Sequence, residues 1–201
     1  MHTEHPHTPG TAAAAAPGSH DRDELRRHLL AQRRAWHESP QAQAAQARVA
    51  LQLLDVLRQL EPLSLGLYWP LPGEFDVVNF AQSHALGNHM QLALPYAWRA
   101  GARMEFRHWS GQPPTMQDEC GIPSCEGPAL VPEVLLVPCV GHTREGYRMG
   151  YGGGYFDRWL AAHPGVTAVG LSWAAGEQRF EVAPHDIALT VVITEAEVLA
   201  P

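Results

Sequence analysis

Hydrophobic residues recur at helical spacing in the first third of the chain. Leu25 and Leu29 form one stripe behind Asp21, whose side chain suits a helix cap, so we predict a helix that begins at Asp21. Pro40 interrupts the stripe, because proline lacks the amide proton that a helix interior needs, and a second helix is expected after it. That helix is expected to end before Pro62. Its apolar positions are Val49, Leu53, Leu57 and Leu60.

Short apolar or alternating runs follow, separated by segments with helical periodicity. The expected strands cover residues 63–69, 91–94, 104–109, 135–138, 166–172 and 190–194. The expected helices cover residues 75–86 and 155–163, and the proline- and glycine-rich stretch 111–132 is expected to be a long loop. Strands that alternate with helices predict an α/β fold, a single three-layer α/β/α domain with a mainly parallel sheet. We assign this domain to residues 21–201 and a disordered tail to residues 1–20.

Composition and charge narrow the class of protein. Hydrophobic residues make up 45% of the chain and charged ones 17%, which is typical of a globular domain. The formal net charge of −7 argues against a protein that binds nucleic acid through a basic surface. No apolar run approaches the roughly 20 residues of a membrane span, and the tail lacks the features of a secretory signal. We therefore expect neither a nucleic-acid nor a membrane partner.

The cationic and thiol side chains limit the chemistry. All 14 cationic residues are arginine, which binds phosphate with two parallel hydrogen bonds but forms no Schiff base, so covalent catalysis by lysine is excluded. Cys120, Cys125 and Cys139 are irregularly spaced and lack two further ligands suited to zinc. An odd, low number of cysteines favours a reducing compartment. We therefore expect a cytoplasmic protein, acting as a monomer.

A glycine-rich segment joins the predicted strand at 135–138 to the predicted helix at 155–163. In open α/β sheets, ligands bind at the carboxyl ends of the strands. Glycines let the backbone turn sharply and let an anion approach its amides, and the helix that follows directs its amide dipoles to the same place. The glycines are Gly150, Gly152, Gly153 and Gly154.

Charged residues flank these glycines. Arg148 and Arg158 are expected to add positive charge at the loop, and Asp157 to hold a magnesium ion beside bound phosphates. The segment lacks the Gly-Lys-Ser/Thr ending of a P-loop, and it does not fit the spacing of a dinucleotide-binding motif. A purely structural glycine-rich turn is the alternative interpretation.

The loop resembles the glycine-rich signature of the 5-formyltetrahydrofolate cyclo-ligase family, also called methenyltetrahydrofolate synthetases. The residues that carry the likeness are 148–158 (RMGYGGGYFDR). Further segments are similar to the family in the same order along the chain: 22–26 (RDELR), 68–76 (YWPLPGEFD), 121–123 (GIP), 183–189 (APHDIAL) and 193–195 (ITE). Only the glycine loop is specific by itself. The other segments become specific through their order, which matches the family over nearly the whole expected domain.

The resemblance implies a defined reaction. Members of this family use ATP and Mg²⁺ to convert 5-formyltetrahydrofolate to 5,10-methenyltetrahydrofolate, with release of ADP and phosphate. ATP phosphorylates the formyl oxygen, N10 attacks the activated carbon, and phosphate leaves as the ring closes. Phosphoryl transfer of this kind needs positioning and charge neutralisation more than a protein nucleophile.

The resemblance also implies roles for individual residues. Arg148 and Tyr155 are the expected catalytic residues, and Asp157 and Asp186 the expected magnesium ligands. The expected ATP-binding residues are Arg22, Arg26, Arg148, Met149, Gly150, Tyr151, Gly152, Gly153, Gly154, Tyr155 and Phe156. The expected binding residues for the reduced folate are Trp69, Glu74, Tyr151, Gly152, Gly153, Gly154 and Tyr155.

Each of the roles outside the loop has a plainer alternative. Arg22 and Arg26 lie four residues apart and are compatible with a solvated helix face. Trp69 suits a core position. Glu74 suits the acidic start of a helix, and Asp186 suits a cap on local backbone amides.

The chain departs from the family pattern at three places. His142-Thr143 stands where the family usually has Phe-Asp, and Thr190 stands where an Asp is common. Both changes are expected to remove carboxylates near the nucleotide. Arg22 replaces the usual lysine, which keeps the charge and changes its reach.

Two other functions stay open. A relative that keeps the fold and the ATP loop could act on another small carboxylated or pterin-like molecule, because a fold does not fix a function. A non-catalytic protein that binds nucleotide or folate is the second alternative.

Overall fold

The computed structural model describes the backbone of residues 19–201 and the side chains from residue 21 onward. The disordered tail predicted for residues 1–20 therefore falls almost entirely outside the described residues. Ser19 already belongs to the first helix. Within residues 19–201, no helix combines the length and the apolar character that crossing a membrane requires.

Two long helices open the described chain. Helix α1 covers Ser19–His37 and helix α2 covers Gln41–Leu60. The predicted start of α1 at Asp21 was wrong by two residues, because an acidic side chain is favoured throughout the first turn of a helix and does not by itself mark the first residue. Helix α2 matches its prediction, except that Leu60 is exposed at the end of the stripe.

The centre of the molecule is a seven-stranded sheet in the order β11-β10-β9-β6-β1-β2-β3. The five strands from β10 to β2 pair in parallel, whereas β3 and β11 are antiparallel edge strands. A mainly parallel sheet is thereby confirmed. The strands are β1 Ser64–Gly66, β2 Gln91–Trp98, β3 Arg103–Trp109, β6 Val134–Pro138, β9 Thr167–Leu171, β10 Val191–Ile193 and β11 Val198–Leu199.

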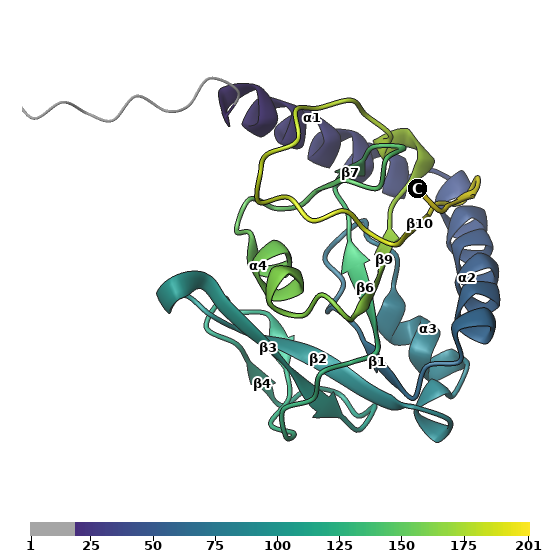
Figure 1. The fold of residues 1–201 in the computed structure, drawn as a ribbon. Coiled ribbons are helices and arrows are strands. Elements are labelled where there is room, and N and C mark those ends of the chain that lie inside the picture. Colours follow the sequence, from purple (N-terminus) through teal and green to yellow (C-terminus); the bar gives the residue numbers. More distant parts are fainter. Residues whose placement is uncertain (1–18) are drawn as a thin grey trace, which may run out of the picture.

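Helices cover both faces of this sheet, which confirms the three layers. Helix α2 and helix α3, Val77–Ser83, lie on one side of β6 and β9, and helix α4, Tyr155–Ala162, lies on the other (Figure 1). Strand β6 shows why: Val134 and Leu136 belong to the hydrophobic cluster under α2, whereas Leu135 and Val137 belong to the cluster under α4. Successive side chains of a strand point to opposite faces, so a buried parallel strand is apolar throughout.

Local side chains explain where the prediction missed boundaries. The helix predicted for residues 75–86 begins only at Val77, because the Asp76 carboxylate accepts a hydrogen bond from the Asn79 amide and caps it. A separate 3₁₀ turn, Leu86–Asn88, follows it. The strand predicted for residues 91–94 extends to Trp98, because it pairs along its length with β3.

The segment predicted as a long loop, residues 111–132, contains a small hairpin formed by β4 and β5. Its strands are β4 Met116–Gln117 and β5 Pro123–Ser124. The Asp118 carboxylate holds the turn, since it accepts hydrogen bonds from the amides of Cys120 and Ile122 at 2.8 and 2.9 Å. A second hairpin, β7 Gly141–His142 with β8 Arg148–Met149, carries the chain from β6 into the glycine-rich loop.

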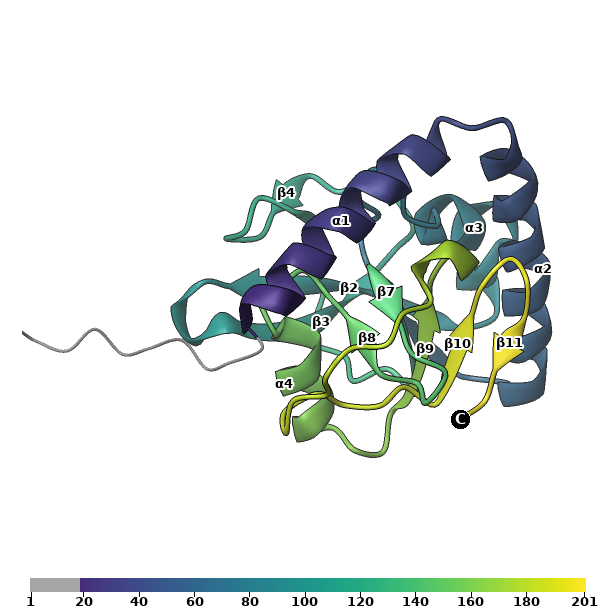
Figure 2. The ribbon, with the colours of Figure 1, turned by 90° about the horizontal axis from the view of Figure 1, so that it is seen from above.

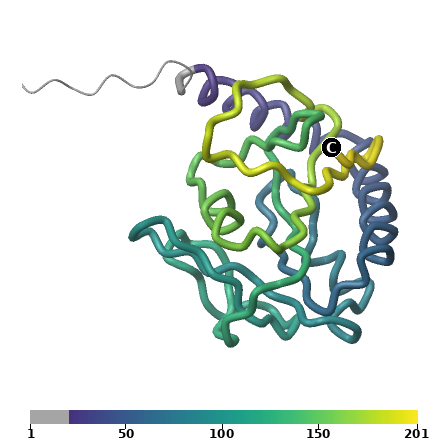
Figure 3. The backbone as a smooth tube through the Cα atoms, viewed as in Figure 1, coloured from purple at the N-terminus to yellow at the C-terminus, as the bar shows by residue number. Residues whose placement is uncertain are grey.

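The strand order creates a crevice beside β1 and β6. From β1 the chain runs through α3 to β2 on one side, and from β6 it runs through α4 to β9 on the other (Figure 3). Such a reversal of strand order is where open α/β sheets bind ligands, beyond the carboxyl ends of the strands. Helix α1 lies beside β7 in both ribbon views (Figures 1 and 2), and its Leu29 packs with Val140 and Met149.

Candidate functional site

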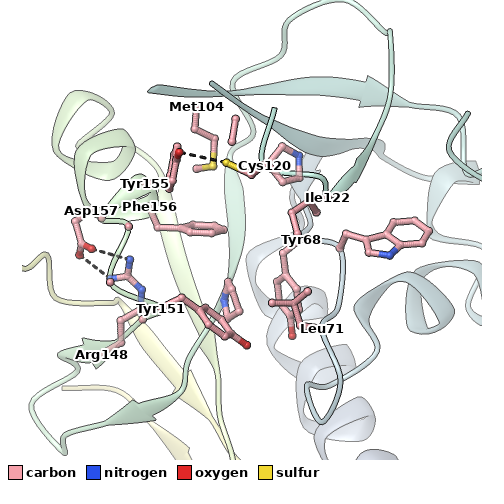
Figure 4. Close-up of a pocket in the computed structure, with 18 of the residues that line it drawn as sticks. Tyr68, Leu71, Met104, Cys120, Ile122, Arg148, Tyr151, Tyr155, Phe156 and Asp157 are labelled. Atoms are coloured by element: carbon pink, nitrogen blue, oxygen red, sulfur yellow. Dashed lines mark hydrogen bonds and ion pairs between the residues drawn. The ribbon is translucent and has the colours of Figure 1, made fainter. Parts of the chain in front are cut away.

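A cavity of about 420 Å³ lies beyond the carboxyl ends of β1 and β6. This volume is typical of small-molecule sites. Six segments that are distant in the sequence supply its walls: α1, the turn after β1, the β2–β3 hairpin, the β4–β5 turn, the glycine-rich loop with the start of α4, and the segment at residues 185–186. Figure 4 shows part of this lining, with Tyr68 and Leu71 on one side and Tyr155 and Asp157 on the other. The strand reversal therefore holds an open chamber in which several segments meet.

The glycine-rich loop forms one wall with bare backbone. Gly152 and Gly154 have φ angles of +91° and +62°, which an L-residue adopts only with strain. Gly154 is the N-cap of α4, and no side chain caps the helix there. A Cβ atom on Gly150 would meet nothing within 4 Å. The loop thus lines the cavity with backbone that side chains do not cover and brings the start of a helix to it, as at known anion sites.

Arg148 and Asp157 join the two ends of this loop. Arg148 Nη1 lies 2.7 Å from Asp157 Oδ1, and Nη2 lies 3.1 Å from Oδ2. Arg148 is only 5% exposed, and its Nε has no hydrogen-bond partner. Both residues line the cavity. The guanidinium therefore carries a positive charge at the cavity wall, where Asp157 pairs with it and its buried Nε has no partner.

Two arginines of α1 also face the cavity. Arg22 donates to both carboxylate oxygens of Asp186, at 2.7 and 3.3 Å, and Arg26 Nε donates to the Gly150 carbonyl at 2.8 Å. Their side chains are 20% and 17% exposed, so they are not a solvated helix face. The sequence predicted both residues at an ATP site. In the fold, Arg26 contacts the glycine-rich loop at Gly150, and Arg22 contacts Asp186, which lines the same cavity.

The opposite wall holds the residues expected to bind folate. Trp69 is half-buried and lines the cavity. Glu74 is buried, and its carboxylate accepts hydrogen bonds from the Tyr151 hydroxyl and from the Leu71 amide. Burial raises the pKa of Glu74, while the Leu71 amide, Tyr151 and Arg33 oppose that shift. Glu74 is therefore a buried acceptor at the cavity and not a surface acid at a helix start.

Sequence reasoning missed Arg33. Its guanidinium donates to the Tyr151 hydroxyl and lies 3.5 Å from Glu74 Oε1. A signal was present, because Arg33 follows Leu25 and Leu29 at intervals of four residues and so occupies the apolar stripe of the first helix. A charged residue on such a stripe is buried and needs a partner.

Tyr155 bridges the helix start and the β2–β3 hairpin. Its hydroxyl lies 3.3 Å from the Trp98 carbonyl oxygen and 3.3 Å from Cys120 Sγ. Figure 4 shows the ring beside Phe156 at the same side of the cavity. Tyr155 and Phe156 both line the cavity, so a ligand bound there could contact them as predicted.

Two loop residues turn away from the cavity. Met149 is fully buried, and its side chain packs with Leu29 and Val140 under α1. Arg158 donates to the carbonyls of Ala102 and Gly153 on the outside of the loop. Neither is among the residues that line the cavity in the described part of the chain.

The carboxylates expected to hold magnesium, Asp157 and Asp186, both line the cavity. No cluster of three or more His, Cys, Asp or Glu side chains suited to a metal occurs in the described residues. Asp157 accepts hydrogen bonds from Arg148 and from the Ile187 amide, and Asp186 accepts them from Arg22 and from the Ala183 amide. A carboxylate offers about four lone-pair positions, so each has about one left. Carboxylate oxygens are suitable donors for Mg²⁺, which here would need most of its ligands from phosphate and water.

Of the described positions that depart from the family pattern, Arg22 lines the cavity, whereas His142, Thr143 and Thr190 do not. His142 is buried, with Nδ1 2.9 Å from Ser172 Oγ, and burial lowers its pKa. Thr190 Oγ1 accepts a hydrogen bond from the Ala168 amide. Neither residue, nor Thr143, is among the cavity-lining residues of the described chain. The replacements at His142, Thr143 and Thr190 therefore leave the side chains that line the cavity unaltered.

Comparisons with known proteins agree with this architecture. A model of the 5-formyltetrahydrofolate cyclo-ligase family matches residues 18–195. The 5-formyltetrahydrofolate cyclo-ligase of Haemophilus influenzae is 25% identical over 155 residues, which cover 73% of this chain and 81% of that protein. The enzyme of the same name from Mycoplasma pneumoniae is 30% identical over 64 residues, 31% of this chain, and that from Mycolicibacterium smegmatis is 35% identical over 65 residues, also 31%. The matches to the latter two span only 39% and 33% of those proteins.

Solved structures share the fold. The 5,10-methenyltetrahydrofolate synthetase of Mycoplasma pneumoniae superposes with a TM-score of 0.70 at 21% identity, covering 86% of this chain and 98% of the other. The synthetase of Aquifex aeolicus superposes with a TM-score of 0.72 at 24% identity, covering 89% and 92%. At this identity the likeness establishes the fold, and the family model, which matches nearly all of the described chain, establishes the kinship. The chain belongs to the 5-formyltetrahydrofolate cyclo-ligase family.

Proposed function

We propose that this protein converts 5-formyltetrahydrofolate to 5,10-methenyltetrahydrofolate and uses ATP, which becomes ADP and phosphate. One observation carries the proposal: a single cavity is lined by the glycine-rich loop on one wall and by Trp69 and Glu74 on the other. A phosphoryl donor and a flat heterocycle can therefore meet in one chamber. The names of the relatives in Haemophilus influenzae and Mycoplasma pneumoniae support the same reaction.

The glycine loop is the proposed phosphate site. Its amides and the start of α4 would accept the phosphates, as helix N-termini do in other nucleotide sites. Arg148 lines the cavity beside the loop, and Arg22 and Arg26 reach it from α1. Guanidinium groups suit this task because they keep their charge when buried and bind phosphate oxygens in pairs. Tyr155 and Phe156 line the cavity at the first turn of α4 and would complete the nucleotide site.

The wall formed by Trp69 and Glu74 is the proposed folate site. Trp69 offers an aromatic surface for the pteridine ring. The Glu74 carboxylate would accept hydrogen bonds from pteridine N–H groups, and bonds of this charged kind are about twice as strong as neutral ones. Tyr151 is shared between the two walls, because it belongs to the glycine loop and donates to Glu74.

The proposed reaction has two steps. The formyl oxygen attacks the γ-phosphorus of ATP, so that an O–P bond forms and the bond from phosphorus to the ADP oxygen breaks. N10 then attacks the activated carbon, the C–O bond breaks, phosphate departs and N10 gives up its proton. Arg148 would neutralise charge on the transferred group, and the Tyr155 hydroxyl would help to position it.

Asp157 and Asp186 are the proposed magnesium ligands. Bound there, magnesium would neutralise phosphate charge. The chain's own contribution is to hold both carboxylates at the wall, each oriented by an arginine. We further propose that the protein acts in the cytoplasm as a monomer, on folate and ATP, without nucleic acid or membrane.

The test is direct. Purified protein is mixed with 5-formyltetrahydrofolate and MgATP, and the absorbance of the methenyl product is followed. Product that forms only with ATP supports the proposal. Tight binding of either ligand without turnover would favour a non-catalytic binding protein, and turnover of another pterin-like substrate alone would favour a relative with different specificity.

Variants of the folate wall sharpen this test. Glu74→Gln should raise the KM for the folate about tenfold or more, because a hydrogen bond to a charged group is lost. Trp69→Ala should also raise this KM, because the aromatic contact with the pteridine is lost. Glu38→Gln is the matched control, because Glu38 is exposed beyond the end of α1. Equal KM values for Glu74→Gln and the control would contradict the assignment of this wall to the folate.

A further inference from the structure

Arg33 lies in the middle of α1 and is buried behind the cavity wall. It is 7% exposed and does not line the cavity. Its Nη2 donates to the Tyr151 hydroxyl, and its Nη1 lies 3.5 Å from Glu74 Oε1. The guanidinium therefore touches two residues of the cavity from the side that ligands do not reach.

These three residues form a closed triangle. The Tyr151 hydroxyl donates to Glu74 Oε1, and the Leu71 amide donates to Glu74 Oε2 at 2.8 Å. Arg33 comes from α1, Glu74 from the turn after β1, and Tyr151 from the glycine loop. The triangle thus ties the proposed folate wall to the proposed phosphate wall through one buried cation.

The stem of Arg33 is fixed by packing. Gly73 has a φ angle of +85°, and a Cβ atom there would lie 3.2 Å from Arg33 Cγ. Trp173 Nε1 donates to the Gly73 carbonyl at 2.8 Å, and the Trp173 ring packs against the Trp36 ring with 4.4 Å between ring centroids. Because the turn rests on the arginine stem, the guanidinium can move little without moving the turn that carries Glu74.

The contact between Arg33 and Glu74 also affects the ionisation of the Glu74 carboxylate. Burial raises the pKa of Glu74, and the Leu71 amide, Tyr151 and Arg33 all act against that rise. The other titratable groups that face Glu74 are Tyr68 and Cys139, which are neutral at ordinary pH and supply no cation. Arg33 is therefore the cation among the groups that keep the buried carboxylate charged.

We propose that Arg33 is a positioning residue for the folate reaction: it holds the Glu74 carboxylate ionised and aimed at the substrate, and it fixes Tyr151 between the two walls. The proposal rests on the function proposed above, because Glu74 must be the folate acceptor for it to matter in turnover. The effect of Arg33 on Glu74 can be tested apart from that function, because Arg33 contacts Glu74 and Tyr151 without substrate.

The first experiment compares Arg33→Met with Arg34→Met. Arg34 is the next residue on α1 and is exposed, so it controls for the loss of one arginine from this helix. Arg33→Met should raise the KM for the folate about 10–100-fold, as expected for a bond to a charged group, with a much smaller effect on kcat. Unchanged KM in Arg33→Met would overturn the proposal.

The second experiment tests whether Arg33 acts through Glu74. Glu74→Gln is combined with Arg33→Met in a double-variant cycle, which isolates the coupling of two residues. If Arg33 works by holding Glu74, the double variant should have the same KM for the folate as Glu74→Gln alone. Additive losses would mean that Arg33 acts elsewhere, and the proposal would fail.

The third experiment separates charge from geometry by pH. Removing a neighbouring cation raises the pKa of a carboxylate, so the folate KM of Arg33→Met should improve as pH rises, over a range where the Arg34→Met control stays flat. Arg33→Lys should restore the flat pH profile and leave KM raised, because lysine keeps the charge and lacks the two-pronged fork. Identical pH profiles in all variants would contradict the charge role.

A last measurement needs no substrate. The ¹³Cδ resonance of Glu74, assigned by its loss in Glu74→Gln, is titrated in the Arg33→Met and Arg34→Met proteins. A higher midpoint in Arg33→Met supports the proposal even if the wild-type protein turns over no folate, so failure of the two proposals is distinguishable. Equal midpoints overturn it. Should Arg33→Met fail to fold, Arg33→Gln is compared with Arg34→Gln instead, because it also removes the cation and keeps a polar side chain; equal midpoints in that pair overturn the proposal in the same way.

Discussion

Arg148 and Asp157 stand nine residues apart and close the glycine-rich loop with a two-pronged ion pair, 2.7 Å on one side and 3.1 Å on the other. The pair lies at the base of a loop whose glycines would otherwise be free to open. It holds the first turn of α4 against β8, and so it fixes the direction in which the helix presents its amides. The same two residues are the proposed phosphate cation and a proposed magnesium ligand.

Breaking this pair should destabilise the fold. Asp157→Asn removes the counter-charge of a guanidinium that is 5% exposed, and breaking a buried ion pair costs about 3 kcal/mol. Urea denaturation gives the free energies of unfolding. The double variant Arg148→Met/Asp157→Asn should recover part of the loss, because no buried charge is left without a partner. Fully additive losses would show that the two side chains are not coupled.

Magnesium dependence should separate the two members of the pair. Asp157→Asn should raise the magnesium concentration for half-maximal activity about tenfold or more, because a carboxylate ligand is lost. Arg148→Met is the matched control, since it breaks the same ion pair and keeps the carboxylate. The concentration of Mg²⁺ is varied at fixed ATP. An equal magnesium requirement in the two variants would refute the ligand role of Asp157.

Two alanine substitutions should distinguish backbone strain from anion access. Gly152 has a φ angle of +91°, so Gly152→Ala should cost about 1–3 kcal/mol of stability. Gly150 has no positive φ angle and open space around it, so Gly150→Ala should change stability by less than about 0.5 kcal/mol. Its added methyl group should nevertheless raise the KM for ATP. Thermal melts and ATP titrations measure the two effects, and a normal KM for ATP in Gly150→Ala would argue against phosphate contact there.

Acid should destabilise the protein through His142. Burial lowers the pKa of His142 below its usual 6.5, so the folded state binds this proton less readily than the unfolded state. Stability is therefore present above pH 6.5 and falls below it, by up to about 1.4 kcal/mol per pH unit. His142→Gln retains a partner for Ser172 Oγ and cannot become charged. Its free energy of unfolding should depend less on pH between 5 and about 6.5, and parallel curves for the two proteins would exclude His142 as the cause.

The sequence by itself determined which segments form helices and central strands, and it predicted the chemistry of the loop. Strand β6 is apolar at every position, which is possible only where both faces of a sheet are covered, and α2 carries an apolar stripe that predicts one buried face. The glycines and arginines of residues 148–158 predicted an anion site because few other structures require them together. These signals are local, since periodicity and turn chemistry act within a few residues.

The tertiary structure alone decided which of these residues meet. Arg22 pairs with Asp186 across 164 positions, and Arg33 reaches Tyr151 across 118, and neither contact leaves a pattern within a short window of sequence. The antiparallel edge strands β3 and β11 were likewise unpredictable in direction, because an apolar run fixes burial and not its partner. Periodicity records which side of an element is covered. What covers it depends on the path of the whole chain, and here that path brings α1, the turn after β1 and the glycine loop to one cavity.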